Sequence, residues 1–188
     1  MTVNSGISRR QWLLAVGTAS LAMGHTSFGP VRPALVVPNV SVQWNDGTQR
    51  ELAGVLTNRV TAIQWIFTSC RSTCPMQGAI FQRIQKRMPD HSTRGIQLLT
   101  LSVDPVNDSP KALSEWLKRF HAAQGWRAGS PAKNDLERLR AFFSQTEKPV
   151  DNHSTQVFLV DRKGSLVWRT DDLPDPAKVA EMLEKVAA

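Results

Sequence analysis

The chain has two cysteines, Cys70 and Cys74, separated by three residues in a short polar loop. An apolar run precedes the loop. Pro75 follows it as the expected first residue of a helix, where the missing N–H of proline would have no partner. Cys74 is therefore expected at or beside the helix N-cap, where the positive end of the helix stabilises a thiolate, and Arg71 adds positive charge. Two such thiolates can close a reversible disulfide or bind a soft metal ion such as Cu(I) or Zn(II).

His153 is the histidine whose predicted position could bring an imidazole to the two thiols. It precedes a predicted strand, residues 156–160, whose beginning reaches the cysteine loop only if it runs antiparallel to the strand before that loop. Two thiolates and one imidazole would suit Cu(I), which accepts low coordination, better than a structural Zn(II) site with its usual four protein ligands. A capping or solvated histidine is the alternative interpretation.

Three further side chains near the loop have both a structural and a functional interpretation. Met76 is a soft potential ligand, but its helical spacing with Ile80 and Ile84 favours a place in the core. Asp104 and Asp108 could orient the metal ligands, yet capping and turn formation is the favoured role for both.

Two buried strands and the helix between them are predicted to position the cysteines. Residues 61–67 and 96–103 are nearly continuously apolar, as in strands that are covered on both faces, and apolar residues recur at helical spacing from Met76 to the break at Pro89. A strand, helix and strand in this order form a right-handed unit with parallel strands. The cysteine loop and the 104–108 loop then leave the same edge of the sheet, where ligand sites of open α/β sheets gather.

The remaining predicted elements complete a single α/β domain without internal repeats. The βαβ unit followed by an antiparallel hairpin and a helix is the thioredoxin arrangement, here with flanking helices and an N-terminal hairpin. Predicted hairpins pair residues 40–44 with 48–52 and 156–160 with 165–169, and further helices cover residues 110–121, 134–143 and 176–186. We expect Asp108 or Ser109, Asn134 and Asp175 to cap these helices.

The N-terminal residues 1–24 resemble a twin-arginine export signal. Arg9 and Arg10 precede an apolar stretch that is shorter than the roughly 18 residues of a membrane-spanning helix. A cleaved signal would place the protein in the periplasm, whereas a retained segment would tether it to the membrane. Residues 25–39, with three prolines and no periodicity, are expected to be a linker, and residues 40–188 to form the domain.

The composition is that of a globular protein, with 41% hydrophobic and 21% charged residues and a formal charge of +7. Lysines and arginines are scattered, without a block of like charge or interleaved aromatic residues, which argues against nucleic-acid binding. We expect a solvated basic surface that could meet an acidic protein partner. A purely structural disulfide is disfavoured because the Cys70–Cys74 loop is too short to constrain the unfolded chain much.

Three stretches together resemble the Sco/SenC family. They are Cys-x-x-x-Cys-Pro within residues 68–75, Ser-Val-Asp-Pro-x-x-Asp-Ser-Pro at 102–110, and His-Ser at 153–154 before a strand. The resemblance covers the chain from about Val40 onward and implies a thioredoxin-fold protein of the bacterial envelope or mitochondrial inner membrane. It also implies one copper ion, held by Cys70, Cys74 and His153. Members deliver copper to the dinuclear CuA site in subunit II of cytochrome c oxidase or keep its cysteines reduced, and some bacterial members act mainly as thiol-disulfide reductases.

The chain departs from the family pattern by losing two acidic groups. Arg71, Ser72 and Thr73 stand where the family commonly has Pro-Asp-Ile, and Asn152 replaces an aspartate before the histidine. A more positive site favours thiolates and changes copper affinity or partner choice.

The expected function is that of a periplasmic copper metallochaperone that binds Cu(I), with Cu(II) left open. Its partners would be an apo copper-oxidase subunit or another envelope thiol protein, and a thioredoxin-like reductant. The alternative is a thiol-disulfide oxidoreductase that uses Cys70 and Cys74 as a redox pair, with His153 incidental.

Overall fold

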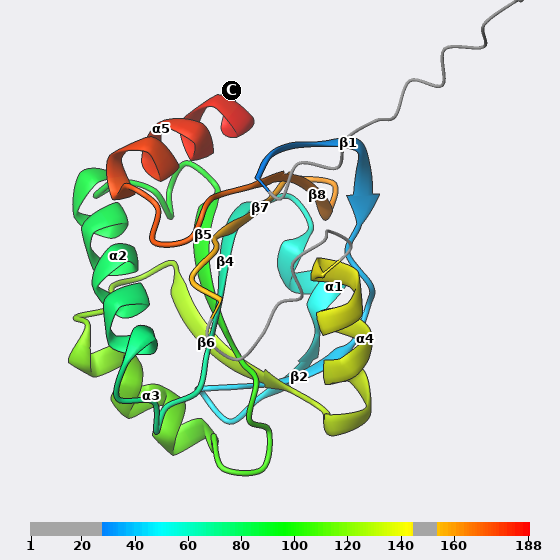
Figure 1. Ribbon diagram of the computed structural model, residues 1–188, viewed down its shortest axis with the longest axis vertical. Coiled ribbons are helices and arrows are strands. Elements are labelled where there is room, and N and C mark those ends of the chain that lie inside the picture. Colours follow the sequence, from blue (N-terminus) through cyan, green and yellow to red (C-terminus); the bar gives the residue numbers. More distant parts are fainter. Residues whose placement is uncertain (1–27, 145–153) are drawn as a thin grey trace, which may run out of the picture.

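The structure is a computed structural model that describes residues 28–144 and 154–188. These residues form one mixed sheet in the order β1-β8-β7-β4-β5-β6-β2-β3 (Figure 1). The strands are β1 (Gly29–Val36), β2 (Ser41–Trp44), β3 (Gln49–Glu51), β4 (Val60–Ile66), β5 (Ile96–Ser102), β6 (Trp126–Pro131), β7 (Phe158–Val160) and β8 (Ser165–Arg169). The helices are α1 (Leu52–Leu56), α2 (Thr73–Arg87), α3 (Pro110–Arg119), α4 (Lys133–Phe143) and α5 (Pro176–Ala187).

Helices cover both faces of the sheet, which explains why its central strands are continuously apolar. Every residue of β4 and β5 is buried. Helices α2, α3 and α5 pack on one face and α1 and α4 on the other (Figure 1). Alternate side chains of β4 therefore enter different cores: Ala62 and Ile66 face α2, whereas Ile63 and Trp65 join the cluster with α4.

The central topology confirms the predicted thioredoxin-like arrangement. Strands β4 and β5 are parallel and joined through α2, and β7 runs antiparallel to β4 and forms a hairpin with β8. The carboxyl ends of β4 and β5 and the beginning of β7 therefore meet at one edge of the sheet. The fold thus brings the cysteine loop, the 104–108 loop and the chain that enters β7 to the same edge.

The predicted linker is wrong for most of its length. Strand β1 occupies residues 29–36 of it and pairs antiparallel with β8. Pro30 and Pro33 are tolerated because β1 is an edge strand, so the N–H groups that proline lacks are not needed by a further neighbour. The expected export signal, residues 1–24, lies outside the described residues. No helix in the part of the chain that the structure describes is long and apolar enough to cross a membrane.

Two other elements were absent from the sequence prediction, α1 and β6. Strand β6 is a third parallel strand beside β5. Its sequence, Trp-Arg-Ala-Gly-Ser-Pro, hides the strand because it carries small residues rather than β-branched ones. Gly129 is required there, since a Cβ would lie 2.5 Å from Val42 and 2.8 Å from Trp44 on neighbouring β2.

The helix starts agree in part with the predicted caps. Ser109 accepts a hydrogen bond from the N–H of Ala112, and Asp175 accepts one from Ala177, as expected for N-caps. The prediction for Asn134 is wrong, because α4 begins at Lys133 after Ala132, which makes no side-chain cap. Helix α2 begins at Thr73, two residues before the expected Pro75, so Cys74 lies inside the first turn.

We expect Gly78→Ala to lower the free energy of unfolding by about 1 to 3 kcal/mol through overpacking. A Cβ at Gly78 would lie 2.4 Å from the ring of Phe120, which cannot move freely because it packs against Trp116 with the ring centroids 4.7 Å apart. Urea denaturation measures the change. Gly54→Ala in α1 is the control, since its Cβ would meet nothing within 4 Å. Equal stability of the two variants would contradict the close approach of α2 and α3.

Candidate dithiol and metal centre

The cysteine loop leaves the carboxyl end of β4 and turns directly into α2. The N–H of Cys70 donates to the carbonyl of Phe67 at 3.1 Å, which closes the turn that carries the first sulfur. Cys70 is 7% exposed and Cys74 1% exposed, and both are unbridged. The site is thus a reduced dithiol at the start of a helix, with the first sulfur the more accessible.

The helix N-terminus stabilises the thiolate of Cys70. Burial, the largest single influence, raises the pKa of Cys70, but hydrogen bonds from the N–H groups of Cys74 and Ser72 outweigh it. The Ser72 hydroxyl, 3.6 Å from the sulfur, and the Cys74 thiol contribute further, so that the pKa of Cys70 falls to about 6. The exposed Arg71 is not among these contacts. Backbone N–H groups at the helix start therefore stabilise the thiolate, a role that we had predicted in part for Arg71.

Cys74 behaves in the opposite way, which corrects the expectation that the helix end would favour its thiolate. Burial raises the pKa of Cys74 to about 12, and the neighbouring Cys70 adds to the increase through hydrogen bonding and charge. The backbone of Phe67 and the Thr73 hydroxyl oppose the increase without cancelling it. At neutral pH the pair is one thiolate and one thiol.

Asp108 joins the cysteine loop to the end of β5. Its carboxylate, 3% exposed, accepts hydrogen bonds from the N–H of Thr68 at 3.1 Å and from the Thr68 hydroxyl at 2.5 Å. It also accepts from the hydroxyl of Ser102 at 2.6 Å. Asp108 is therefore not the helix cap, which is Ser109, but the group that fixes the loop two residues before Cys70. Asp104 has the expected turn role, accepting from the side chain of Asn107 at 2.8 Å.

Gln77 connects α2 to the segment that enters β7. Its side chain is buried and donates from Nε2 to the carbonyl of Ser154 at 2.8 Å. Thr155, the next residue, donates from its N–H and hydroxyl to Asp172 at 3.1 Å. His153 itself lies outside the described residues. Gln77 was not among the predicted site residues, although a polar residue one turn after Cys74 on the inner side of an amphipathic helix was a signal for it.

Met76 was predicted to lie in the core, but it is 43% exposed beside the cysteine loop. Within residues 28–144 and 154–188, no three His, Cys, Asp or Glu side chains come together as a metal cluster. Of the predicted ligand set, the described residues hold the two cysteines, and the third member, His153, lies outside them.

Comparison with known proteins agrees with this geometry. A family model described as SCO1/SenC matches residues 43–188. The SCO1 protein homolog of Bacillus subtilis (strain 168) is 25% identical over 120 residues, which cover 60% of this chain and 62% of that protein. The chain spans about three fifths of the length of the first curated relatives it matches.

Two solved structures share the fold. Bradyrhizobium japonicum ScoI with copper bound has a TM-score of 0.67 at 17% identity and covers 80% of this chain and 99% of its own. BsSco, described with a disulfide switch as a member of the Sco family of cytochrome c oxidase assembly proteins, has a TM-score of 0.70 at 21% identity. It covers 83% of this chain and 95% of its own. Because the family model matches well over half of its length, the chain belongs to the SCO1/SenC family.

Proposed function

We propose that the protein carries copper on Cys70, Cys74 and His153 during the assembly of a copper oxidase, with the CuA site of cytochrome c oxidase as the favoured recipient. The observation that carries the proposal is the hydrogen bond from Gln77 to Ser154. It ties the residue next to His153 to the helix that carries Cys74. A third ligand adjacent to this bond would complete a set of two sulfurs and one nitrogen, which suits Cu(I).

The chemistry of the donors and the relatives both support copper as the cargo. Thiolate ligands favour Cu(I) over hard cations. ScoI from Bradyrhizobium japonicum, which shares the fold, has been solved with copper bound. Cu(II) as a second cargo stays part of the proposal.

Loading and release follow from the unequal thiols. The Cys70 thiolate is available at neutral pH, whereas Cys74 must lose its proton when it becomes a ligand. On transfer the recipient's thiolates replace these ligands one at a time, and Cys74 takes up a proton again as it leaves the ion. The high pKa of Cys74 therefore favours release of the ion, and the low pKa of Cys70 favours its capture.

The place of action and the partners are part of the same proposal. A twin-arginine signal in residues 1–24 would bring the protein to the periplasm, or tether it there if the segment is retained. The recipient would be an apo copper-oxidase subunit or another envelope thiol protein, and a thioredoxin-like reductant would restore the dithiol after oxidation.

A thiol-disulfide oxidoreductase is the second candidate, and the divided pKa values favour it specifically. Cys70, with the low pKa and the greater exposure, would attack a partner disulfide, and Cys74 would resolve the mixed disulfide. The disulfide switch described for BsSco is consistent with such chemistry in a relative. A Cys74→Ser variant, which keeps the attacking sulfur, is then the form that traps a partner.

Copper titration of the reduced protein tests the metal proposal. We expect one Cu(I) per chain, loss of binding in Cys70→Ser and Cys74→Ser, and a weaker site in His153→Ala. His121→Asn is the matched control, because His121 has φ 53°, which asparagine tolerates. If copper affinity is unchanged in His153→Ala and binding is lost only in the cysteine variants, the imidazole is not a ligand. The redox function would then be the better supported of the two.

Gln77→Glu tests whether the bond to Ser154 orients the third ligand. A carboxylate cannot donate to the Ser154 carbonyl, so we expect copper affinity to fall by about 10 to 100-fold, as for other groups that orient metal ligands. Gln82→Glu on the same helix carries the same charge change as a control. Competition with a chromophoric Cu(I) chelator measures both. Equal affinities for the two variants would contradict this role of Gln77.

The pH dependence of alkylation tests the division between the thiols. Iodoacetamide attacks the thiolate, so the rate at Cys70 should rise through pH 6 and reach its plateau by about pH 8. Cys74 should stay slow at pH 8, because its pKa is raised to about 12. Peptide mass spectrometry of the reduced protein assigns the two rates. A Cys70 midpoint near 9, or faster labelling of Cys74, would overturn the assignment.

A further inference from the structure

The outward stripe of α2 changes from apolar to basic along the helix. Met76, Ile80, Arg83 and Arg87 recur at spacings of three and four and so lie on one face. Met76 and the two arginines are exposed, and Ile80 is half-buried. Helix α2 contains no acidic residue. The helix that begins at the dithiol therefore presents a methionine beside the sulfurs and cations further along.

Several cations around the C-terminal end of α2 form no ion pair with a carboxylate of the described residues. We define the basic face as Arg83, Lys86, Arg87 and Arg119. All four side chains are exposed, and none forms an ion pair with another described residue. Gln85 brings α3 against α2 by hydrogen bonds to the carbonyl of His121 and the N–H of Ala123, which places Arg119 beside this end of the helix.

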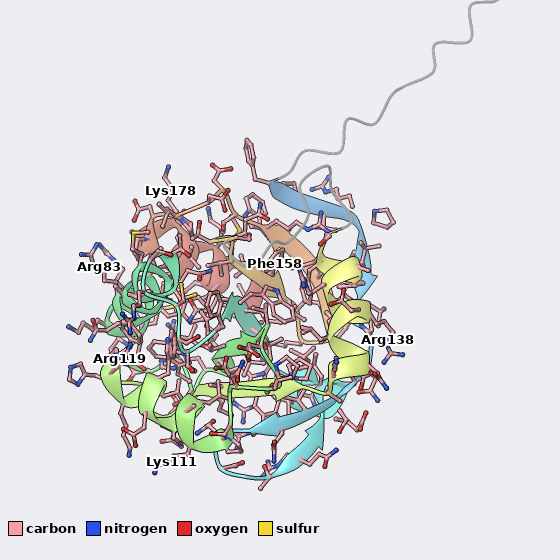
Figure 2. The ribbon with its side chains drawn as sticks, turned by 60° about the horizontal axis from the view of Figure 1, so that its bottom comes forward. Arg83, Lys111, Arg119, Arg138, Phe158 and Lys178 are labelled. Carbon is pink, nitrogen blue, oxygen red and sulfur yellow. The ribbon has the colours of Figure 1, made fainter. Side chains whose placement is uncertain are left out.

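Several arginines elsewhere on the described surface are paired with carboxylates, whereas the four cations of the basic face lie together without one. Arg50 and Arg127 both contact Asp46, and Arg138 contacts Asp135. Asp175, the cap of α5, is the one carboxylate among the residues that line the groove between α2 and α5, so the three α2 cations there outnumber it. Figure 2 shows Arg83 and Arg119 pointing outward on the same side of the molecule, with Lys111 and Lys178 at the two ends of this side.

The distances fit one docking surface that includes the dithiol. Arg83 and Arg87 follow Cys74 by 9 and 13 residues, or about 14 to 20 Å along a helix with 1.5 Å rise per residue. An ordinary interface covers about 800 Å² on each partner, roughly 30 Å across, and so would reach from the sulfurs to the cations. Val106 adds apolar surface at the cysteine edge, because it is 76% exposed in the loop that Asp108 joins to Thr68.

We propose that the basic face docks an acidic surface of the protein that exchanges copper or electrons with the dithiol, while Met76 and Val106 contact apolar surface around its reacting groups. The inference rests on the proposed function and adds the chemistry of the partner. A partner protein fits better than a nucleic acid, because the exposed large apolar residues of the described chain include a single aromatic, Phe28, which lies before β1 and not on α2 or α3. Opposite charges would speed encounter and orient the sulfurs toward the partner.

Thiol exchange with charged peptides tests the proposal without an identified partner. The oxidised protein is mixed with a synthetic peptide that carries two cysteines flanked by glutamate, serine or lysine. The peptide loses two electrons and two protons as its disulfide forms, and the Cys70–Cys74 disulfide gains both. At low ionic strength we expect the glutamate peptide to react about tenfold faster than the serine peptide, and the lysine peptide to react more slowly. In about 0.5 M salt the differences should shrink to within about twofold, because screening shortens the reach of the charges.

Charge reversal locates the effect. Arg83→Glu, Lys86→Glu and Arg87→Glu together should abolish the advantage of the glutamate peptide. The control Arg59→Glu, Lys133→Glu and Lys163→Glu makes the same change of net charge on exposed residues outside the basic face and should keep most of that advantage. Equal rates for the glutamate and serine peptides, or equal losses in the two triple variants, would overturn the proposal. A membrane role for the same residues would also overturn it. In that case the wild type, but not the Arg83, Lys86 and Arg87 variant, would bind vesicles of equal parts phosphatidylcholine and phosphatidylglycerol, and the peptides would show no charge preference.

Reduction by dithiothreitol separates this inference from the proposed function. Dithiothreitol attacks as a thiolate but carries no charged flanking groups, so its rates with the wild type and the two triple variants should differ far less than the rates with the charged peptides. A disulfide that does not form, or that dithiothreitol cannot reduce, would count against the redox chemistry. Failure to bind copper, together with a preserved preference for the glutamate peptide, would count against the metal proposal and leave the docking surface standing.

Discussion

The carboxylate of Asp108 holds together the two loops that leave the carboxyl ends of β4 and β5. It accepts hydrogen bonds from Thr68, 40 residues away in the chain, and from Ser102 at the end of β5, the strand before its loop. Because Thr68 precedes Cys70 by two residues, this buried contact fixes where the polypeptide turns toward α2. The position of the first sulfur over the helix start, and with it the hydrogen bonds that stabilise its thiolate, depends on that turn.

The same turn makes the two cysteines chemically unequal. The N–H groups of Ser72 and Cys74 point at the sulfur of Cys70, whereas Cys74 is buried within the first turn of α2 and beside the negative charge of its neighbour. A poised thiolate next to a protonated thiol serves both candidate functions. In metal capture the first sulfur binds before the second loses its proton, and in disulfide exchange the first attacks and the second resolves. The dithiol serves copper carriage and redox exchange alike, so a third ligand at His153, as proposed, would distinguish the two functions.

Sequence patterns predicted the parts of the fold that rest on local periodicity or local capping. The apolar runs of β4 and β5 and the caps at Ser109 and Asp175 belong to this class. Strand β1 was missed because its prolines are typical of a loop and are tolerated only at the edge of a sheet. Strand β6 was missed because its glycine is required by close contacts with β2, which no local sequence pattern reveals. The order of the two thiol pKa values depends on which sulfur the helix N–H groups face, a property of three-dimensional position. The exposure of Met76 is of the same kind, since its helical spacing gave the correct helix but the wrong side of it.

X-ray absorption at the copper K-edge of the Cu(I)-loaded protein can identify the three ligands, because it reports the atoms bonded to the ion. We expect a low-coordinate Cu(I) with two sulfur neighbours and one nitrogen neighbour that shows the outer-shell scattering of an imidazole. A spectrum without sulfur neighbours, or one with two sulfurs and no imidazole scattering, would contradict the three-ligand site formed by Cys70, Cys74 and His153.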